Sequence, residues 1–394
     1  MKNKITIVGG LGHIGLPLSV LFANKNFEVH VYDKNKDIIP EILKGKMPFL
    51  ENQGNQNLKK ALKKKLYFHT DPGDYLKNSI ILITVGTPVD SFLNPDMDYI
   101  KLCIDELIPF LSDKQLIILR STVFPGTSEW IDNYLKSKDI YCNISFCHER
   151  VIQGKTFEEI ENLPQIIAGN NKFAIDQSIK IFKKISNKII ISSLKEAEFS
   201  KLFANTFRYI QFAVSNEFYM LADRAGLDYN KIRKITQLGY PRAEGLPKAG
   251  FAAGPCLFKD TMQLVSYSRN SFQLGASAML VNEGLALYIH EKLEKKYGEG
   301  ISELSIGILG MAFKAEIDDI RSSLSYKLKK TLFSHVKKIY CHDPYVKIDK
   351  SLVSLDLLIK NCNVVILCAP HKTYKNIKLK KSTFVIDIWD HINK

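Results

Sequence analysis

One cysteine of this sequence lies in a loop whose composition suits a nucleophile. The loop spans residues 250–260 and places Cys256 after Gly254 and before Lys259. Small residues let a substrate carbon approach the main chain, and a nearby ammonium favours the thiolate, the form of cysteine that attacks carbonyl carbon. A single cysteine in a glycine-containing loop is also compatible with a structural role. The loop therefore predicts a catalytic thiol if the rest of the chain supplies a substrate site.

A glycine motif near the start of the chain suits a dinucleotide. A strand-like run at residues 5–8 leads into Gly10-Leu11-Gly12-His13-Ile14-Gly15, and Asp33 ends the next strand-like run. Such glycines allow a tight turn and let a pyrophosphate approach the start of a helix, while the acid binds a ribose diol. A tight turn without a ligand is the alternative. Because an aspartate repels a 2′-phosphate, Asp33 favours NAD over NADP, a preference that Lys34 weakens slightly.

Further polar motifs lie just beyond predicted strands. Thr87 follows one strand, and Ser121 and Thr122 follow another, at the edge where open α/β sheets bind ligands. Each motif could also be only a turn. The run Cys147-His148-Glu149-Arg150 ends a further strand, and its glutamate could activate water or be a surface charge. The cysteine and histidine beside that glutamate lack further ligands at a suitable spacing, so no metal site is predicted.

A long helix is predicted over residues 193–226. Ser193 and Glu196 form a capping box at its start, and apolar residues, mostly phenylalanines, then recur at spacings of three and four. Lys201 and Asn205 are one turn apart, so they share a face opposite the phenylalanine stripe. This pair is either a solvated face of the helix or part of a polar site.

The remaining elements alternate as in a doubly wound sheet covered by helices. The strand candidates are residues 5–8, 28–32, 79–85, 115–119, 143–147, 165–168 and 188–191, and then 304–309, 338–341, 364–368 and 384–388. A second long helix is predicted over residues 274–296, and residues 297–300 are its stop and a linker. We therefore predict an α/β protein in which a helical segment separates a larger from a smaller α/β unit.

Length and composition indicate a globular chain of two or three domains. The 394 residues are 45% hydrophobic and 24% charged, and no apolar run reaches the roughly 18 residues of a membrane helix. The seven cysteines include no CxxC pair, which argues against a disulfide scaffold and structural zinc. The net charge is +14, but the lysine clusters have no aromatic residues between them. The charge therefore fits an anionic small-molecule substrate or a solvated surface better than nucleic-acid binding. We expect a cytoplasmic protein without nucleic-acid or membrane partners.

These motifs together resemble the nucleotide-sugar 6-dehydrogenases, the group that includes UDP-glucose and UDP-N-acetylmannosamine dehydrogenases. The resemblance spans nearly the whole chain, and it also covers the motifs at residues 310–314 and 319–321. It implies two Rossmann-like doubly wound domains joined by a central helical domain. The implied bounds are 1–192 for the NAD-binding domain, 193–299 for the dimer-forming helical domain with the cysteine loop, and 300–394 for the domain that binds the nucleotide-sugar.

The implied reaction is a four-electron oxidation of the sugar C6 alcohol to a carboxylate by two NAD in succession. By resemblance, Cys256 attacks the C6 aldehyde to give a thiohemiacetal, which is then oxidised to a thioester and released by water. Covalent capture divides a hard oxidation into easier steps. Lys201 and Asn205 are implied to stabilise the developing oxyanion.

The resemblance assigns water chemistry to three further residues. Asp260 is implied to orient or deprotonate a water in the alcohol step, and Thr122 to help hold that water. Glu149 is similar to the residue that assists thioester hydrolysis.

Substrate contacts carry over from the same family. Gly254, Lys259 and Lys314 correspond to positions at the cysteine loop, the sugar and its pyrophosphate, and Arg242 resembles an arginine delivered by the neighbouring subunit of a homodimer. Arg321 is interpreted as an ion-pair residue at the start of a helix and is left outside the predicted site.

The sugar is indicated only by the segment His148-Glu149-Arg150-Val151, which resembles the N-acetylhexosamine enzymes more than the UDP-glucose enzymes. A UDP-N-acetylhexosamine is therefore favoured, followed by UDP-glucose and then GDP-mannose. Two other functional classes stay open: a two-electron dehydrogenase of the β-hydroxyacid type, and a non-catalytic nucleotide-binding module in which the cysteine loop only packs.

Overall fold

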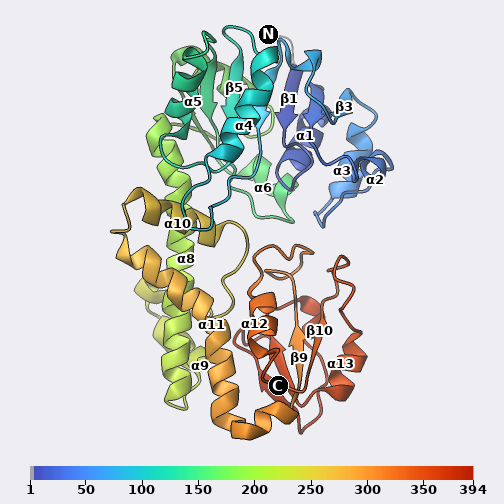
Figure 1. Ribbon diagram of the computed structural model, residues 1–394, viewed down its shortest axis with the longest axis vertical. Helices are drawn as coiled ribbons and strands as arrows, with labels where there is room; N and C mark the ends of the chain where they lie inside the picture. The colour runs from blue at the N-terminus through green and yellow to red at the C-terminus, as the bar shows by residue number, and fades with distance from the viewer. Residues whose placement is uncertain (1–3, 394) are drawn as a thin grey trace. The chain divides into compact units, whose positions relative to one another are not determined.

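The chain forms two compact units in the computed structural model, Met1–Phe203 and Ala204–Lys394 (Figure 1). The structure describes residues 4–393, so the outermost ends of the first and last predicted domains, residues 1–3 and 394, lie outside the described residues. Within residues 4–393, no helix is long and apolar enough to cross a membrane.

The first unit is built on an eight-stranded sheet with the order β3-β2-β1-β4-β5-β6-β7-β8. The strands are β1 (Lys4–Val8), β2 (Glu28–Tyr32), β3 (Leu66–His69), β4 (Ile80–Ile83), β5 (Leu116–Leu119), β6 (Asn143–Phe146), β7 (Gln165–Gly169) and β8 (Ile189–Ile191). All neighbours pair in parallel except β6 and β7, which are antiparallel. The chain order changes direction at β1, and at such a switch point the carboxyl ends of the strands leave a crevice for a ligand.

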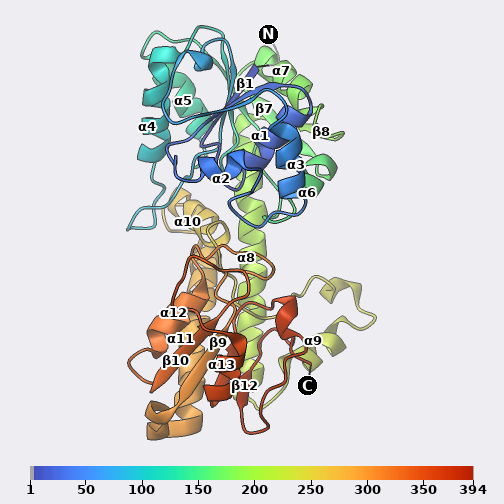
Figure 2. The same ribbon diagram turned by 90° about the vertical axis from the view of Figure 1, so that its right-hand side faces the viewer.

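Helices cover both faces of this sheet because its strands are apolar on both sides (Figure 2). Successive residues of a strand face opposite ways: in β5, Ile118 packs with the core under one set of helices and Ile117 with the core under the other. The first set is α1 (Gly15–Asn24), α3 (Gly54–Ala61), α6 (Thr156–Asn162) and α7 (Lys172–Phe182), and the second is α4 (Asp98–Leu107) and α5 (Thr127–Lys136). Each fully buried isoleucine contributes about 1.5–3 kcal/mol through loss of water contact.

The long helix α8 (Leu194–Arg224) contains the boundary between the two units, after Phe203. Its capping box is confirmed: the Ser193 hydroxyl accepts from the Glu196 amide at 3.4 Å, and the Glu196 carboxylate accepts from the Ser193 amide at 3.1 Å. The second unit continues with α9 (Tyr229–Gln237), α10 (Leu257–Tyr267) and α11 (Gln273–Tyr297).

The second unit ends in a four-stranded parallel sheet with the order β10-β9-β11-β12. Its elements are β9 (Ser305–Leu309), α12 (Leu324–Leu332), β10 (Lys338–His342), α13 (Leu355–Asn361), β11 (Val364–Leu367) and β12 (Phe384–Ile386). Leucines of α11 and α12 pack on one face of this sheet, and α13 covers the other. The predicted fold class, two doubly wound sheets with helices between them in the sequence, is confirmed.

Candidate active site

The glycine motif lies between β1 and α1 and leaves room for a phosphate at one glycine only. A Cβ atom at Gly15 would lie 2.6 Å from the Cα of Gly10, and one at Gly10 would lie 2.6 Å from a methyl group of Val31. At Gly12, which is exposed, the nearest atom would be 3.7 Å away. Gly10 and Gly15 are therefore required by packing, whereas Gly12 keeps the approach to the start of α1 open. Amides at a helix N-terminus bind phosphate oxygens, so the loop fits a dinucleotide.

The rest of the fingerprint sits around this loop. Asp33 follows β2, and its carboxylate accepts hydrogen bonds from the amides of Leu11 at 3.0 Å and of Asn35 at 2.9 Å. Lys34, which follows it, is exposed and forms an ion pair with Glu106. His13 stacks on Phe49 with 4.1 Å between ring centroids, and Ile14 immediately precedes α1.

The predicted hydroxyl residues join the loops that follow β4 and β5. Thr87 donates a hydrogen bond to the backbone carbonyl of Thr122, and Ser121 donates to the carbonyl of Val85 at 2.6 Å. Both loops lie at the carboxyl edge of the sheet, as predicted. These bonds fix the backbone of the two loops with respect to each other.

Glu198 of α8 supports the same edge, although no motif of the sequence indicates it. Its buried carboxylate accepts hydrogen bonds from the amides of Gly126 at 2.6 Å and Ser128 at 2.9 Å, and from the Ser128 hydroxyl at 2.6 Å. Burial raises the pKa of Glu198, while these hydrogen bonds lower it. The residue thereby holds the loop after β5 on α8.

Glu149 is buried at the end of β6 and forms an ion pair with Arg120. The Arg120 guanidinium donates to Glu149 at 2.5 Å and to the carbonyl of Cys147 at 2.7 Å. The other carboxylate oxygen of Glu149 accepts from the amides of Arg150 at 2.7 Å and Val151 at 3.1 Å. The interpretation of Glu149 as a surface charge is therefore wrong, and Arg120, fully buried after β5, is a partner that no local pattern indicated.

Lys201 is half-buried on α8 and lies near this region. Burial lowers the pKa of His148 well below 6.5, and the charges of Lys201 and Arg120 lower it too. His148 is therefore a neutral ring beside two cations. The first unit thus gathers an ammonium, a neutral imidazole and a fixed carboxylate near the end of β6.

Cys256 stands at the N-terminal cap of α10 in the second unit. It is exposed, whereas the other six cysteines are buried. The positive end of the helix dipole favours a negative charge on its sulfur. Arg321 contributes in the same sense: hydrogen bonds with Asp319 raise the pKa of Arg321, and so does the negative charge of an ionised Cys256. Arg321 thus lies within electrostatic reach of the thiol, although the sequence predicted it to be outside the site.

Asp260 lies one turn further along α10 and is fully buried. Asn205 of α8 donates a hydrogen bond to its Oδ2 at 2.5 Å, and the Lys259 ammonium lies 2.9 Å from its Oδ1. Oδ1 accepts no hydrogen bond within residues 4–393, because the ammonium pairs with it by charge without hydrogen-bond geometry. The surface interpretation of Asn205 is therefore wrong, and Asp260 keeps a lone pair for a hydroxyl group or a water.

The cysteine loop is fixed by close backbone packing. Gly254 has a φ of 102°, and a Cβ atom there would lie 2.5 Å from the ring of Phe313. A Cβ atom at Gly250 would lie 2.3 Å from the ring of Trp389, whose indole donates to the carbonyl of Cys368 at 2.9 Å. Both glycines are required, because no side chain fits where these rings pack.

The last two predicted substrate residues are on loops of the second unit. Lys314 directly follows Phe313 and is half-buried. Arg242 is exposed, and its guanidinium donates to the Tyr240 hydroxyl at 3.0 Å and lies over the Tyr240 ring. The described contacts of Arg242 do not connect it with the other predicted site residues.

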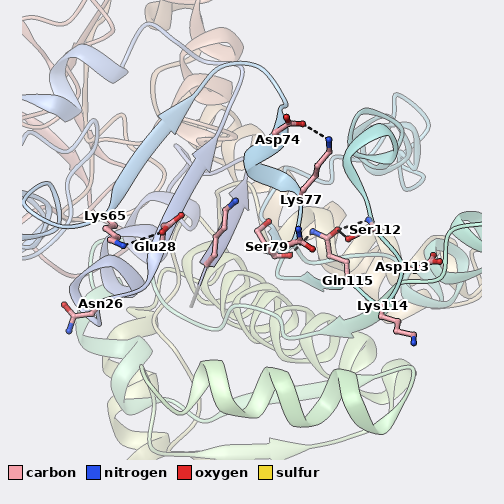
Figure 3. A pocket seen from close by; sticks show the side chains of 12 residues that line it. Asn26, Glu28, Lys65, Asp74, Lys77, Ser79, Ser112, Asp113, Lys114 and Gln115 are labelled. Atoms are coloured by element: carbon pink, nitrogen blue, oxygen red, sulfur yellow. Dashed lines mark hydrogen bonds and ion pairs between the residues drawn. The ribbon is translucent and has the colours of Figure 1, made fainter. Parts of the chain in front are cut away.

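A large hollow of the first unit lies at the opposite edge of the sheet (Figure 3). It measures about 840 Å³ and is lined where strands begin, by Lys4, Glu28, Ser79 and Gln115 among others. Ligands of open α/β sheets bind at the carboxyl ends of the strands. This hollow is therefore not assigned to the cofactor.

The fold and these groups define a class: a dehydrogenase with a Rossmann cofactor site and an exposed thiol at the start of a helix. Three family descriptions match the chain in order: the NAD binding domain of the UDP-glucose/GDP-mannose dehydrogenase family at residues 3–186, its central domain at 195–284 and its UDP binding domain at 307–394. The chain belongs to the UDP-glucose/GDP-mannose dehydrogenase family. It is an NAD-dependent nucleotide-sugar dehydrogenase.

Named relatives and solved structures agree with this assignment. The UDP-N-acetyl-D-mannosamine dehydrogenase of Methanococcus maripaludis is 30% identical over 95% of this chain and 88% of its own. That of Pyrococcus horikoshii is 29% identical over 93% of this chain and 90% of its own, and its structure superposes with a TM-score of 0.87 over 95% and 91%. A UDP-glucose dehydrogenase from Pyrobaculum islandicum, 22% identical, shares the fold with a TM-score of 0.89 over 98% of both chains.

Proposed function

We propose that this enzyme oxidises the C6 alcohol of a UDP-N-acetylhexosamine to the carboxylate through a thioester on Cys256. The observation that carries the proposal is the thiol itself, exposed at the start of α10, with Arg321 within electrostatic reach and the buried Asp260 on the same helix. We assign the NAD-binding domain to residues 1–192, the helical domain to 193–299 and the nucleotide-sugar domain to 300–394.

The reaction balances with two hydrides and one water. Bound NAD would supply the hydride acceptor for each of the two oxidations. The C6 alcohol loses a hydride and a proton to become an aldehyde, and the Cys256 sulfur adds to that carbonyl carbon to give a thiohemiacetal. Loss of a second hydride and a proton leaves a thioester, and water then cleaves the C–S bond to give the carboxylate and the free thiol. Covalent capture keeps the aldehyde bound between the two oxidations.

The groups of the second unit suit the steps on the sugar carbon. The α10 dipole and the Arg321 charge stabilise the thiolate that attacks the aldehyde. The Asp260 carboxylate, with Oδ1 paired by charge with Lys259 and Oδ2 accepting from Asn205, can hold a water or the C6 hydroxyl and take up its proton. Lys259 balances the charge of Asp260. Lys259, Gly254 and Lys314 are assigned to substrate binding, together with Arg242 from a partner copy of the chain.

The first unit supplies cofactor binding and the remaining polar groups. Gly10, Gly12, Gly15 and Asp33 hold the dinucleotide, and Thr87, Ser121 and Thr122 shape the edge beside it. Lys201 is assigned to oxyanion stabilisation, because an ammonium near the end of β6 can attract the negative charge that develops on a substrate oxygen. Glu149, held in place by Arg120 and two amides, is assigned to the hydrolysis of the thioester.

The N-acetylhexosamine preference is supported by the names of the relatives. The eight relatives compared, from archaea and bacteria, are all called UDP-N-acetyl-D-mannosamine dehydrogenase. The segment around Glu149 favours the same substrate class. UDP-glucose is the alternative that an assay has to exclude.

Counting NADH per sugar consumed tests the proposal. The purified enzyme is offered UDP-N-acetylhexosamines, UDP-glucose and GDP-mannose, and both NADH absorbance and the sugar product are followed. We expect two NADH per carboxylate formed, and Cys256→Ala to reduce turnover to background. Cys142→Ala, which changes a buried cysteine of the first unit, should leave turnover unchanged. One NADH per sugar, or normal turnover of Cys256→Ala, would contradict the thioester route.

We also propose that the enzyme is a homodimer joined through α8. The apolar stripe of this helix is exposed rather than buried, and it consists of Phe203, Phe207, Val214, Phe218 and Leu221. On α11, Leu280 and Leu287 are exposed to 67% and 55% and border a hollow next to α8. So much contiguous apolar surface is typical of an interface, and a second copy of the chain offers the same surface in return.

Size-exclusion chromatography with light scattering tests the dimer. We expect a dimer for the natural chain and a monomer for Phe207→Asp, since a charge at this position cannot be desolvated in an apolar interface. Phe173→Asp, at an exposed phenylalanine of α7, is the matched control and should stay dimeric. A natural chain that is monomeric at micromolar concentration would refute the dimer without affecting the proposed chemistry.

A further inference from the structure

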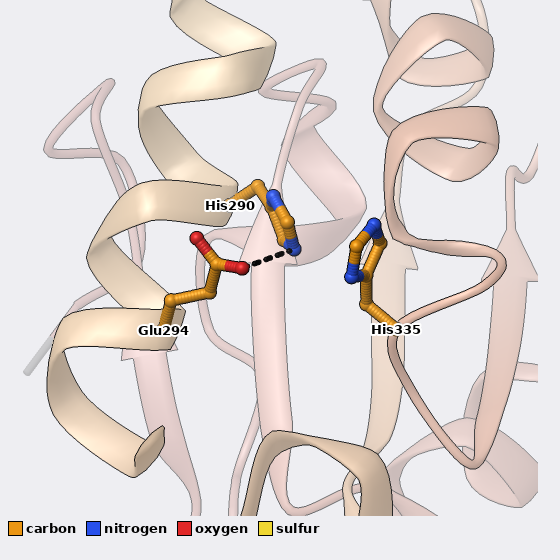
Figure 4. A group of neighbouring side chains, drawn as sticks. All are labelled: His290, Glu294 and His335. Carbon is orange, nitrogen blue, oxygen red and sulfur yellow. Dashed lines mark ion pairs between the residues drawn. The ribbon is translucent and has the colours of Figure 1, made fainter. Parts of the chain in front are cut away.

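Two histidines and a glutamate converge in the second unit, and none of the three is assigned above to catalysis or to cofactor or substrate binding. His290 and Glu294 are one turn apart on α11, and His335 lies on the turn between α12 and β10 (Figure 4). One ligand atom of each side chain can be chosen so that all three atoms lie within 4.8 Å of one another. The centroids of the two histidine rings lie 4.2 Å apart, and the ring planes are tilted by 53°.

The hydrogen bonding of this cluster is incomplete. The Nε2 atom of His290 is buried and makes no hydrogen bond within residues 4–393, and its nearest charged neighbour is Glu294, at 3.5 Å. A buried ring nitrogen without a partner costs free energy unless something else satisfies it.

The donor set selects a class of ion. Two imidazole nitrogens and one carboxylate oxygen suit Zn²⁺ and related transition metals, whereas Mg²⁺ and Ca²⁺ prefer all-oxygen sites. A zinc site with three protein ligands takes a water as its fourth ligand. Glu294 is half exposed and His335 is exposed, so both side chains can move the short way that coordination at about 2.0–2.2 Å requires.

We propose that His290, Glu294 and His335 form a binding site for a divalent transition-metal ion of the Zn²⁺ class, which no step of the sugar oxidation uses. The ion would connect α11 with the turn after α12, and thus the helical part of the second unit with its Rossmann-like part. An ion that binds only the folded chain stabilises it by mass action.

A second histidine pair differs from the proposed site in the hydrogen bonding of its ring nitrogens. His30 and His69 in the first unit also lie close together, here with stacked rings, and have a glutamate, Glu28, beside them. There, however, the two rings share a direct hydrogen bond of 2.9 Å, and Glu28 approaches the other nitrogen of His30. The ring nitrogens already satisfy each other, so that pair offers no convergent set of ligand atoms and serves as a control.

Calorimetric titration of the full chain with ZnCl₂ tests the proposal. We expect one ion per chain, with affinity lowered by more than about 10- to 100-fold in His335→Ala and Glu294→Gln, because loss of a direct ligand exceeds the loss of an outer-shell partner. Glu291→Gln, one residue after His290 and paired with Arg224 instead, should bind as the natural chain does, as should His69→Ala.

Two further measurements, thermal unfolding and Co²⁺ absorption, test the same site. Zn²⁺ should raise the melting temperature of the natural chain and of Glu291→Gln but not that of His335→Ala, whose ion-free melting temperature reports that it folds. Co²⁺ in place of Zn²⁺ should give an absorption spectrum without thiolate charge transfer, which excludes binding at a cysteine. Undiminished affinity in His335→Ala, a thiolate band, or no binding by the natural chain would each overturn the proposal.

Discussion

The buried ion pair between Arg120 and Glu149 makes the stability of the first unit sensitive to one substitution. Arg120→Met keeps much of the side-chain volume but leaves the Glu149 carboxylate, 8% exposed, without its cation. It also removes the donors to the carbonyls of Cys147 and His148. Breaking a buried pair from one side costs about 3–5 kcal/mol, because an uncompensated charge stays buried.

That free energy converts into a measurable shift of the melting temperature. The first unit has about 200 residues, for which each kcal/mol shifts the midpoint by roughly 2–4 °C, so Arg120→Met should lower it by about 6–20 °C. The chain has two tryptophans, and Trp130 lies in the first unit. In a Trp389→Phe background, fluorescence therefore reports the unfolding of the first unit alone.

Two further variants separate the charge from the packing. Adding Glu149→Gln to Arg120→Met removes the buried charge while an amide oxygen still accepts from Arg150 and Val151, so about 1–3 kcal/mol should return. Arg120→Lys keeps the charge without the branched geometry and should lose less than Arg120→Met. A loss below about 1 kcal/mol for Arg120→Met, or no recovery in the double variant, would refute the assignment of this pair as a buried, coupled one.

Two other predictions concern the same unit. Gly12→Ala should fold normally but lose NAD affinity, because its methyl group enters the open approach to α1. Gly15→Ala should instead lower the melting temperature, because its methyl group clashes with Gly10. Titration with NAD and thermal unfolding distinguish the two variants, and equal behaviour of both would contradict the packing argument. The depressed pKa of His148 means that the unfolded chain binds a proton below pH 6.5 that the folded chain does not, so stability present above pH 6.5 is lost as the pH falls. Between pH 7.5 and 5.5 this amounts to about 1.4 kcal/mol in urea unfolding, and His148→Gln should lack that component.

Patterns that are local in the sequence predicted the structure best. The glycine motif, the strand ends and the capping box each rest on a few neighbouring residues, and each was found where the pattern placed it. Strand β3 was missed because Leu66–His69 is short and largely half-buried or exposed, so it carries no strong alternation. Helices α9 and α10 were also not predicted, and the start of α10 is what gives Cys256 its helix N-terminus.

Long-range pairing could not be predicted from one sequence. Nothing near Arg120, Arg321 or Glu198 indicates which distant group each one faces. The apolar period of α8 correctly predicted a helix but not its buried face: Phe207 is 62% exposed, whereas Asn216 is fully buried between Asn282 and the amide of Gly250. Periodicity shows that a face is apolar, and only the tertiary structure shows what covers it.

Because Trp389 packs against Gly250, the loop that contains Cys256 can be completed only after the C-terminal segment has been synthesised. A ribosome releases residues 250–260 long before it reaches the segment that forms β12 and the turn after it. Until the Trp389 indole is synthesised, the backbone at Gly250, in the same loop as Cys256, lacks the ring that packs against it. A premature stop shortly before Trp389 would therefore leave both sheets with nearly all their strands and still deprive the Cys256 loop of its fixed position.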